Sequence, residues 1–157
     1  MNAAYAPQAT LNLHARHYRI IEDLLEADPR RIEAAHQEVS PVFEETFVAF
    51  GDPGRLVGQL AHNFAGRILA QIAVPAFDWG RRLHDQEALR RMIVLKREAK
   101  EHQIAPEGMD AFLSQQPEDL RNPFTGEPFG WSAETYEIHF VPSAANYWKR
   151  ETLIVVY

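Results

Sequence analysis

A chain of 157 residues is long enough to bury one hydrophobic core, and we expect a single domain over residues 1–157. Its hydrophobic share of 46% and charged share of 24% are those of a folded globular chain and exclude intrinsic disorder. The formal net charge of -6 removes long-range attraction to phosphate, so no nucleic acid is expected as a partner. The chain has no cysteine, which excludes disulfides, thiol nucleophiles and thiolate metal sites.

The N-terminal third predicts helices after a short leader. Residues 1–10 are small and polar, and they predict an extended leader. Apolar residues recur at helical spacing over residues 11–27, which predicts the first helix. Two further short helices are predicted where a capping residue precedes a proline suited to the first helical turn: Asp28-Pro29 and Ser40-Pro41.

The segment from Asp52 to Phe77 has the strongest helical pattern, and we expect the fold to be organised around it. Its apolar residues fall in pairs one turn apart with polar residues between them, which makes one broad apolar face. Pro75 predicts a kink, because a proline inside a helix removes one backbone hydrogen bond. The helix is expected to resume and to reach about residue 103, with Asp85 able to cap its second part.

The chain changes character after Pro117. Residues 122–126, Asn-Pro-Phe-Thr-Gly, have the chemistry of a tight turn. Strands are predicted where aromatic and β-branched residues alternate or cluster: 128–131, 136–141 and 151–157. The predicted class is α+β, with a mainly helical body of five or six helices over residues 11–116 and a small three-stranded antiparallel sheet within residues 122–157. The body includes the long kinked helix around residues 53–103.

The predicted turn also carries a resemblance to a known family. It reads Asn122-Pro123-Phe124-Thr125-Gly126-Glu127-Pro128-Phe129-Gly130-Trp131. Together with the helix before it, this motif resembles the C-terminal D/N-P-[FY]-[ST]-G-x-P turn of uncharacterised bacterial cell-envelope proteins held by a single membrane span. Upstream, ATLNLHARHYR and GRILAQIAVPAF resemble the soluble part that follows the span in such proteins. The resemblance implies a periplasmic domain whose N-terminal membrane anchor is missing from this sequence; a cytoplasmic protein is the alternative.

Histidines are the candidates for metal binding. His14 and His17 are three residues apart and can share one helix face, but no third ligand is close in the sequence. The residues His62, His84-Asp85 and Asp110 follow the His…His-Asp…Asp order of ligands in metal-dependent phosphohydrolases. Ordinary surface histidines, and a helix cap at Asp85, explain the same residues. A metal-dependent hydrolase is therefore an alternative function, and no cofactor is expected.

Aromatic residues crowd the C-terminal part of the chain. Alternate members are expected to pack against the helices, because aromatic side chains are usually largely buried, and the others are expected to be ordinary strand residues. The loop between the last two predicted strands is instead a candidate binding surface. Trp, Tyr and Arg are the residues that most often anchor interfaces, and loops often carry binding residues. The expected partner-binding residues are Tyr147, Trp148, Lys149, Arg150 and Trp131.

The function predicted from the sequence is a non-enzymatic binding or assembly domain that acts through protein-protein contacts. Neither a G-x-S-x-G nucleophile elbow nor a phosphate-binding loop is present, and adjacent carboxylates such as Glu44 and Glu45 point apart on a helix. A further alternative is an immunity or inhibitor protein that neutralises a toxin, which a compact acidic domain would suit. The sequence defines no oligomeric state.

Overall fold

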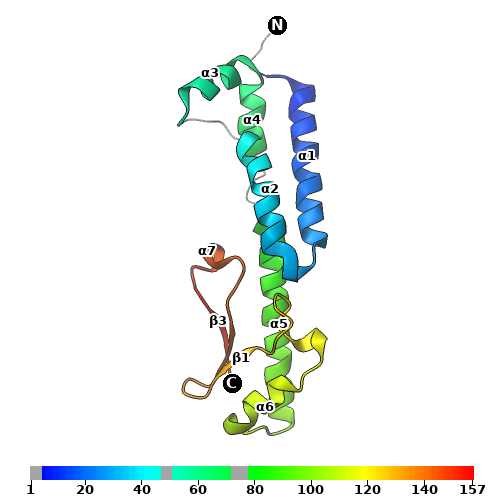
Figure 1. The fold of residues 1–157 in the computed structure, drawn as a ribbon, viewed down its shortest axis with the longest axis vertical. Helices are drawn as coiled ribbons and strands as arrows, with labels where there is room; N and C mark the ends of the chain where they lie inside the picture. Colours follow the sequence, from blue (N-terminus) through cyan, green and yellow to red (C-terminus); the bar gives the residue numbers. More distant parts are fainter. Residues whose placement is uncertain (1–4, 47–50, 72–77) are drawn as a thin grey trace. The chain divides into compact units, whose positions relative to one another are not determined.

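The computed structural model describes residues 5–46, 51–71 and 78–157 of the chain. It confirms an α+β fold, with helices over most of the described residues and a small antiparallel sheet near the C-terminus (Figure 1). Contacts between residues divide the chain into two compact units: residues 1–27 with 34–80, and residues 28–33 with 81–157. Each unit has buried residues of its own.

The first unit begins with α1 (Pro7–Glu26). Pro7 suits the first helical turn, because its missing N–H would have no partner there. Residues 7–10 of the predicted leader are therefore helical. The short η1 (Pro29–Arg31) follows α1 in the chain, and its cap Asp28 accepts a hydrogen bond from the Arg30 backbone N–H, as the Asp-Pro pair predicted.

Helix α2 (Ile32–Thr46) runs through Pro41 without a break, so the predicted restart at Ser40-Pro41 is wrong. A proline inside a helix loses one backbone hydrogen bond, and packing must offset this loss. Phe43 supplies such packing, because its ring is buried and stacks on His17 of α1 with centroids 4.6 Å apart. Tertiary contact here outweighs the local signal.

The predicted continuous helix over residues 52–77 is divided in two. Helix α3 (Pro53–Ala61) and α4 (Phe64–Gln71) are separated by an extended His62 and by Asn63, whose φ of 57° lies in the left-handed region. Asn tolerates this conformation better than most residues. The prediction of one unbroken helix up to the kink is therefore wrong, and Pro75, where the kink was predicted, lies outside the described residues.

Buried polar contacts explain the position of this break. The Asn63 side-chain oxygen accepts hydrogen bonds from the Ala6 backbone N–H at 2.9 Å and from the Thr10 hydroxyl at 3.0 Å. Helix α1 packs along α4 next to this site (Figure 1). A β-carbon at Gly66 would lie 2.0 Å from the Thr10 hydroxyl oxygen, so the close approach of the two helices requires glycine there.

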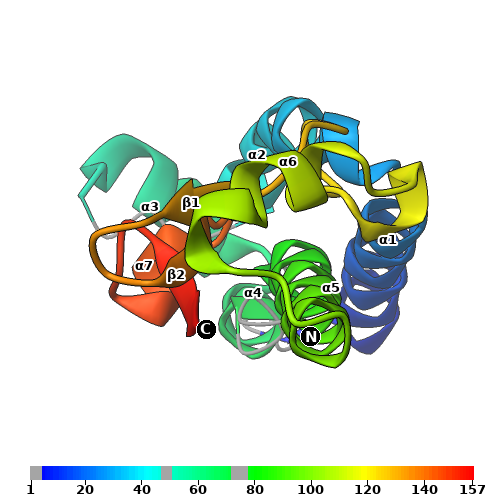
Figure 2. The same cartoon turned by 90° about the horizontal axis from the view of Figure 1, so that it is seen from below.

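The second unit is built on α5 (Trp79–Glu101), from Arg81 onward. The main hydrophobic cluster of the described residues lies here, and not around residues 52–77 as expected. Helix α5 contributes one buried stripe to this cluster: Ala88, Met92, Leu95 and Ala99. The short η3 (Pro106–Gly108), α6 (Met109–Ser114) and η4 (Glu118–Leu120) follow α5, and α6 lies beside β1 (Figure 2). These helices lie mostly within the predicted helical body over residues 11–116.

The C-terminal sheet is antiparallel with the order β1-β2-β3. Its strands are β1 (Gly130–Ser132), β2 (Glu137–Phe140) and β3 (Leu153–Val156). β2 and β3 lie within the predicted segments, and β1 ends one residue beyond its predicted segment. One face packs into the core through Ile138, Phe140 and Leu153. The tight turn before the sheet is also confirmed, because the Gly126 N–H donates to the Asn122 carbonyl at 2.8 Å and Gly126 has a φ of 74°.

A short helix that the sequence did not predict, α7 (Ala145–Trp148), lies in the loop between β2 and β3 (Figure 1). Lys149 ends it in the left-handed region, with a φ of 53°. Over the described ranges, none of the helices is both long enough and apolar enough to cross a membrane.

Candidate protein-binding loop

The loop that carries α7 is held by a buried carboxylate of α5. Asp85 has an exposed fraction of 0%. One of its oxygens, Oδ1, accepts a hydrogen bond from the Ser143 backbone N–H at 2.8 Å. The other, Oδ2, accepts from the Ala144 backbone N–H and from the Trp148 indole N–H, both at 2.9 Å. Asp85 therefore fixes both the start and the last residue of α7 from a different helix.

Arg81 strengthens this attachment one turn earlier on α5. Its guanidinium donates to the Ser143 hydroxyl at 3.2 Å and to the Ser143 carbonyl, and it lies 3.4 Å from a Glu33 carboxylate oxygen. Burial raises the pKa of the Asp85 carboxyl above its ordinary value, while the three N–H donors and the charge of Arg81 act in the opposite direction. A buried carboxylate with this set of donors is a structural acceptor whose oxygens are already occupied.

The outer side of the same loop is aromatic and basic. The Tyr147 side chain is 49% exposed, and the Arg82 guanidinium lies 4.0 Å from the centre of its ring. Lys149 and Arg150 follow in the chain, both exposed, and line a hollow of about 340 Å³ together with Glu151. We call Arg82, Tyr147, Lys149 and Arg150 the α7 patch.

The cations of this patch are not neutralised within the described part of the chain. Arg82, Lys149 and Arg150 make no ion pair with any described carboxylate. Arg81, which precedes Arg82 in the chain, does pair with Glu33. The Nε of Arg82 is buried and has no hydrogen-bond partner among the described residues. On a chain with a net charge of -6, a group of unpaired cations next to an exposed tyrosine is a local departure from the average surface.

The predicted partner-binding residues divide into two kinds. Tyr147, Lys149 and Arg150 lie exposed on the loop. Trp148 is half-buried, packs against the hydrophobic core and donates its indole N–H to Asp85. Trp131 also packs against the core, from β1, in edge contact with Tyr136 and Tyr157. The two tryptophans thus contribute to the fold. The exposed contact surface is formed by Tyr147, Lys149 and Arg150, with the half-buried Arg82 beside Tyr147.

Of the three histidines of the first unit that were predicted as metal ligands, two lie on α1 and the third lies after α3. His14 and His17 lie on α1, and His17 is buried against the Phe43 ring. Burial, together with the nearby charges of His14 and Arg16, lowers the pKa of the His17 imidazole, which favours its neutral form. His62 lies exposed at the break between α3 and α4.

The other predicted ligands, His84 and Asp85, are adjacent on α5 in the second unit. His84 is half-buried with its ring edge-on to Phe124, and burial lowers the pKa of its imidazole. Asp85 lies inside α5, so the prediction that it caps a helix of its own segment is wrong; it holds the start of α7 instead. No three histidines, aspartates or glutamates within the described ranges are close enough together to hold a metal ion.

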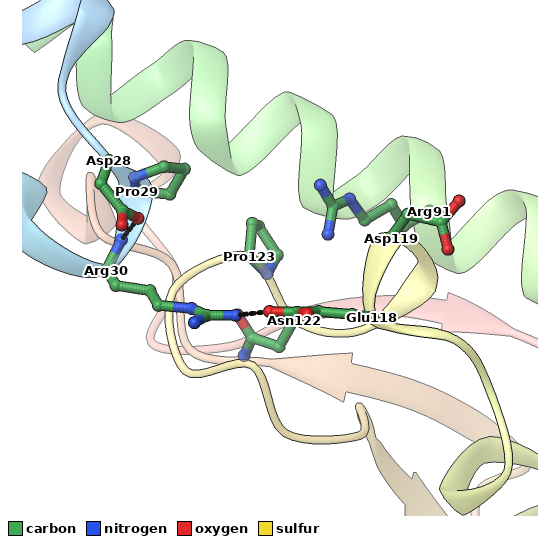
Figure 3. A pocket seen from close by; sticks show the side chains of 8 residues that line it. All are labelled: Asp28, Pro29, Arg30, Arg91, Glu118, Asp119, Asn122 and Pro123. Carbon is green, nitrogen blue, oxygen red and sulfur yellow. Dashed lines mark hydrogen bonds and ion pairs between the residues drawn. The ribbon is translucent and has the colours of Figure 1, made fainter.

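A second hollow of the second unit, of about 460 Å³, lies beside the tight turn (Figure 3). Both of its arginines are engaged: Arg30 pairs with Glu118, and Arg91 donates to the Arg121 carbonyl at 2.9 Å. Its lining residues are Asp28, Pro29, Arg30, Arg91, Glu118, Asp119, Asn122 and Pro123. Because both arginines are already engaged, we interpret this hollow as a joint between η1, η4 and the turn.

Neither Arg82 nor the role of Asp85 was predicted from the sequence, although the position of Asp85 along α5 gave an indication of its role. It lies three residues before Ala88 and seven before Met92, and therefore on the buried stripe of α5. A carboxylate on a buried stripe must find several donors, because burial without them is costly. The pattern could have indicated an internal acceptor, but it could not name the donors in a distant loop.

Comparisons with protein-family models, with curated proteins and with solved structures give no match to this chain. The geometry of the chain itself is therefore the basis for a functional assignment. Of the two polar sites described above in the second unit, the α7 patch has cations without an ion-pair partner among the described residues, whereas the hollow beside the turn has arginines already bound.

Proposed function

We propose that this chain is a non-enzymatic binding or assembly domain that contacts a protein partner through the α7 patch. The observation that carries this proposal is the anchoring of the loop by Asp85 while Tyr147, Lys149 and Arg150 remain exposed. A loop that is ordered before binding loses less conformational entropy on binding. Tyrosine and arginine are also among the residues that contribute most to interface energies.

The charge of the patch supports an acidic partner segment. Arg82, Lys149 and Arg150 have no carboxylate partner within the described chain, so a partner that brings carboxylates would gain ion pairs without breaking existing ones. Tyr147 would supply the apolar contact area at the centre. The partner that fits this chemistry is a protein segment with aspartate or glutamate beside an apolar residue.

We infer a location in the bacterial cell envelope, on the periplasmic side of the inner membrane, from the resemblance of the turn at residues 122–131. A fusion of alkaline phosphatase to the C-terminus of the gene product tests this location, because the enzyme becomes active only after export. We expect active phosphatase in the envelope fraction. A matched fusion to a fluorescent protein that is active only in the cytoplasm is the counterpart. Fluorescence of that fusion together with an inactive phosphatase fusion would support the cytoplasmic alternative.

The binding proposal is tested with a random-peptide display library selected against the wild-type protein. We expect the enriched peptides to be acidic, and their binding to weaken about 30-fold in Tyr147→Ala, which corresponds to about 2 kcal/mol for an interface anchor. The double charge reversal Lys149→Glu with Arg150→Glu should also weaken binding and reduce its dependence on salt.

A matched charge control uses two exposed arginines outside the patch, Arg31→Glu with Arg55→Glu. This pair changes the net charge by the same amount and should leave the dissociation constant within about twofold, as expected for residues away from the interface. Peptides of mainly basic or neutral composition would contradict the proposal. Equal binding by wild type and Tyr147→Ala would contradict it as well.

A further inference from the structure

The C-terminal sheet has one open edge, formed by β3. In the order β1-β2-β3 the outer strands are β1 and β3. Strand β1 has three residues and lies beside α6. Strand β3 (Leu153–Val156) has four residues, and among the described residues β2 is the only strand that pairs with it. An open edge strand presents N–H and C=O groups to which another extended chain can bind.

The backbone groups at this edge can be assigned from the pairing of β3 with β2. The Tyr157 N–H donates to the Tyr136 carbonyl at 2.7 Å, directly across the ladder. Every second residue of an antiparallel strand directs its N–H and C=O groups toward the same neighbour. Val155 therefore bonds toward β2 as Tyr157 does, and the backbone groups of Ile154 and Val156 point to the open side. Neither residue has a backbone hydrogen bond on that side to another described segment.

The sequence of β3 does not protect this edge. Edge strands usually carry a charged side chain or a proline, which keeps other strands from pairing with them. Strand β3 reads Leu-Ile-Val-Val and has neither. The side chains of Ile154 and Val156 are 37% and 54% exposed, on the face of the sheet opposite to that of Leu153, which packs into the core. An added strand with apolar residues beside Ile154 and Val156 would bury both side chains.

Charge differs between the two ends of this edge. Lys149 and Arg150 of the α7 patch lie just before β3, and with Glu151 they give this end a net positive charge. At the other end, Glu137 of β2 lies across from Val156. In an antiparallel addition, the residues that follow the paired segment of the added chain lie beside Lys149 and Arg150. Carboxylates at that end would gain ion pairs, whereas carboxylates before the paired segment would lie nearer to Glu137.

We propose that the acidic partner segment binds as an added antiparallel strand on β3, with its carboxylates beside Lys149 and Arg150. This inference rests on the proposed function and gives the partner segment a conformation and a residue order. Apolar residues at alternate positions lie opposite Ile154 and Val156, and aspartate or glutamate follows them. In this mode of binding the main-chain hydrogen bonds give affinity, and the alternate side chains give specificity.

Backbone methylation of a synthetic peptide tests the added strand. The probe is the capped peptide Thr-Val-Thr-Val-Thr-Glu-Glu, whose valines are placed opposite Ile154 and Val156. N-methylation of both valines removes the N–H groups that face β3 and should weaken binding about tenfold or more. N-methylation of the two threonines that follow the valines changes the opposite edge of the added strand and is the matched control. Equal effects of the two modifications would overturn the proposal.

The order of residues in the probe tests the direction of the added strand. The peptide Glu-Glu-Thr-Val-Thr-Val-Thr has the same composition and charge as the first probe, but its carboxylates precede the paired residues. It should bind about tenfold more weakly, because its carboxylates lie away from Lys149 and Arg150. Equal or tighter binding of this peptide would contradict the antiparallel arrangement.

The variant Ile154→Pro blocks the edge from the side of the protein. The proline ring replaces the N–H that points to the open side, so the ladder to β2 keeps its hydrogen bonds. Ile154→Ala keeps this N–H and is the matched control. Binding of the first probe should weaken about tenfold or more in Ile154→Pro and less than about threefold in Ile154→Ala. Circular dichroism confirms that both variants are folded, and equal binding by the two would contradict the proposal.

Amide hydrogen exchange separates this inference from the proposed function. Saturation with the first probe should slow exchange of the Ile154 and Val156 amides about tenfold, whereas the Val155 amide, already bonded to β2, is the internal control. Acidic peptides that bind the α7 patch and leave both rates unchanged would overturn this inference alone. A display selection without acidic binders would overturn both proposals. Slow exchange at Ile154 and Val156 in the free protein that depends on its concentration would show pairing between two copies and would also overturn this inference.

Discussion

At the scale of single residues, Asp85 shows how one carboxylate can determine the shape of a distant loop. Its three hydrogen bonds reach residues 58, 59 and 63 positions away in the sequence. Each N–H group that donates to Asp85 would be left without a partner if the carboxylate were removed. An unsatisfied buried donor costs about 1 to 3 kcal/mol of stability. Asp85 therefore stabilises the α7 loop through three hydrogen bonds at once.

Asp85→Asn should lower the free energy of unfolding by about 2 to 4 kcal/mol. The asparagine amide places its own N–H group toward the donors of the loop, and the charge beside Arg81 is lost. Urea denaturation at neutral pH measures the change. Glu134→Gln, at an exposed turn position, is the control and should change stability by less than about 0.5 kcal/mol. Similar stability of the two variants would show that the Asp85 hydrogen bonds are dispensable.

Glu87 gives the molecule a defined pH dependence. Hydrogen bonds from Arg90 at 2.7 Å and from Arg91 at 2.9 Å lower the pKa of its carboxyl from 4.5 to about 2. A carboxyl whose pKa is lower in the folded state contributes stability above its unfolded pKa, and this contribution is lost as the pH falls toward the folded pKa. The Glu87 side chain is 35% exposed, so solvent screening limits the contribution to about 1 kcal/mol.

Glu87→Gln tests this dependence. At neutral pH the variant should be less stable than wild type by about 1 kcal/mol, and the difference should shrink steadily below about pH 4.5. Urea denaturation between neutral pH and about pH 3 measures both proteins under matched conditions. A stability difference that is independent of pH would show that the charge of Glu87 is not its source.

At the scale of elements, the contact between α1 and α4 depends on the absence of a side chain at Gly66. A β-carbon there would lie 2.0 Å from the Thr10 hydroxyl oxygen and 2.3 Å from Asn63 Oδ1. Gly66→Ala should therefore lower the free energy of unfolding by about 1 to 3 kcal/mol, as expected for overpacking.

Gly58→Ala is the matched control in the neighbouring helix. No atom lies within 4 Å of a β-carbon at Gly58, which is exposed inside α3. Alanine favours the helix more than glycine does, so the free energy of unfolding of this variant should rise by up to about 1 kcal/mol. Thermal or urea unfolding of the two variants gives opposite signs if the contact is as described; equal effects would contradict the close approach at Gly66.

The elements that could be predicted from the sequence are those whose signals are local. The turn at residues 122–126 follows from the chemistry of asparagine, proline and glycine, and the strands follow from alternation and β-branched residues. The break at Asn63 could not be predicted, because its cause is a pair of hydrogen bonds to residues 57 and 53 positions away. Helix α7 was missed for the same reason, since its anchors lie on α5.

The candidate site was predicted in part. Tyr147, Lys149 and Arg150 were identified because their residue types are typical of interfaces and because loops tend to be exposed. Trp148 has the same type of signal, yet its indole N–H is bound within the fold. Residue type alone cannot separate an exposed anchor from a buried one, and Arg82 was missed because only the folded chain brings it to the Tyr147 ring.

At the scale of the whole molecule, the α7 patch and the exposed apolar side chains of α1 lie in different units. The α7 patch belongs to the second unit and is suited to an acidic protein segment, whereas Leu11, Tyr18 and Leu25 of α1 belong to the first unit. Substitution of an exposed α1 residue should therefore leave peptide binding at the α7 patch unchanged. The dissociation constant of the acidic peptide is expected to be the same for wild type and Tyr18→Ala.

The central claim is that the loop anchored by Asp85 is the partner-binding surface, and backbone amide NMR tests it most directly in a chain of 18.0 kDa. The isotope-labelled protein is titrated with an acidic peptide from the display selection. The predicted result is that the largest shift changes occur at residues 143–150 and at the Trp148 indole N–H. Shift changes concentrated at residues 28–31 and 118–123, or along α1, with the loop unaffected would contradict the claim.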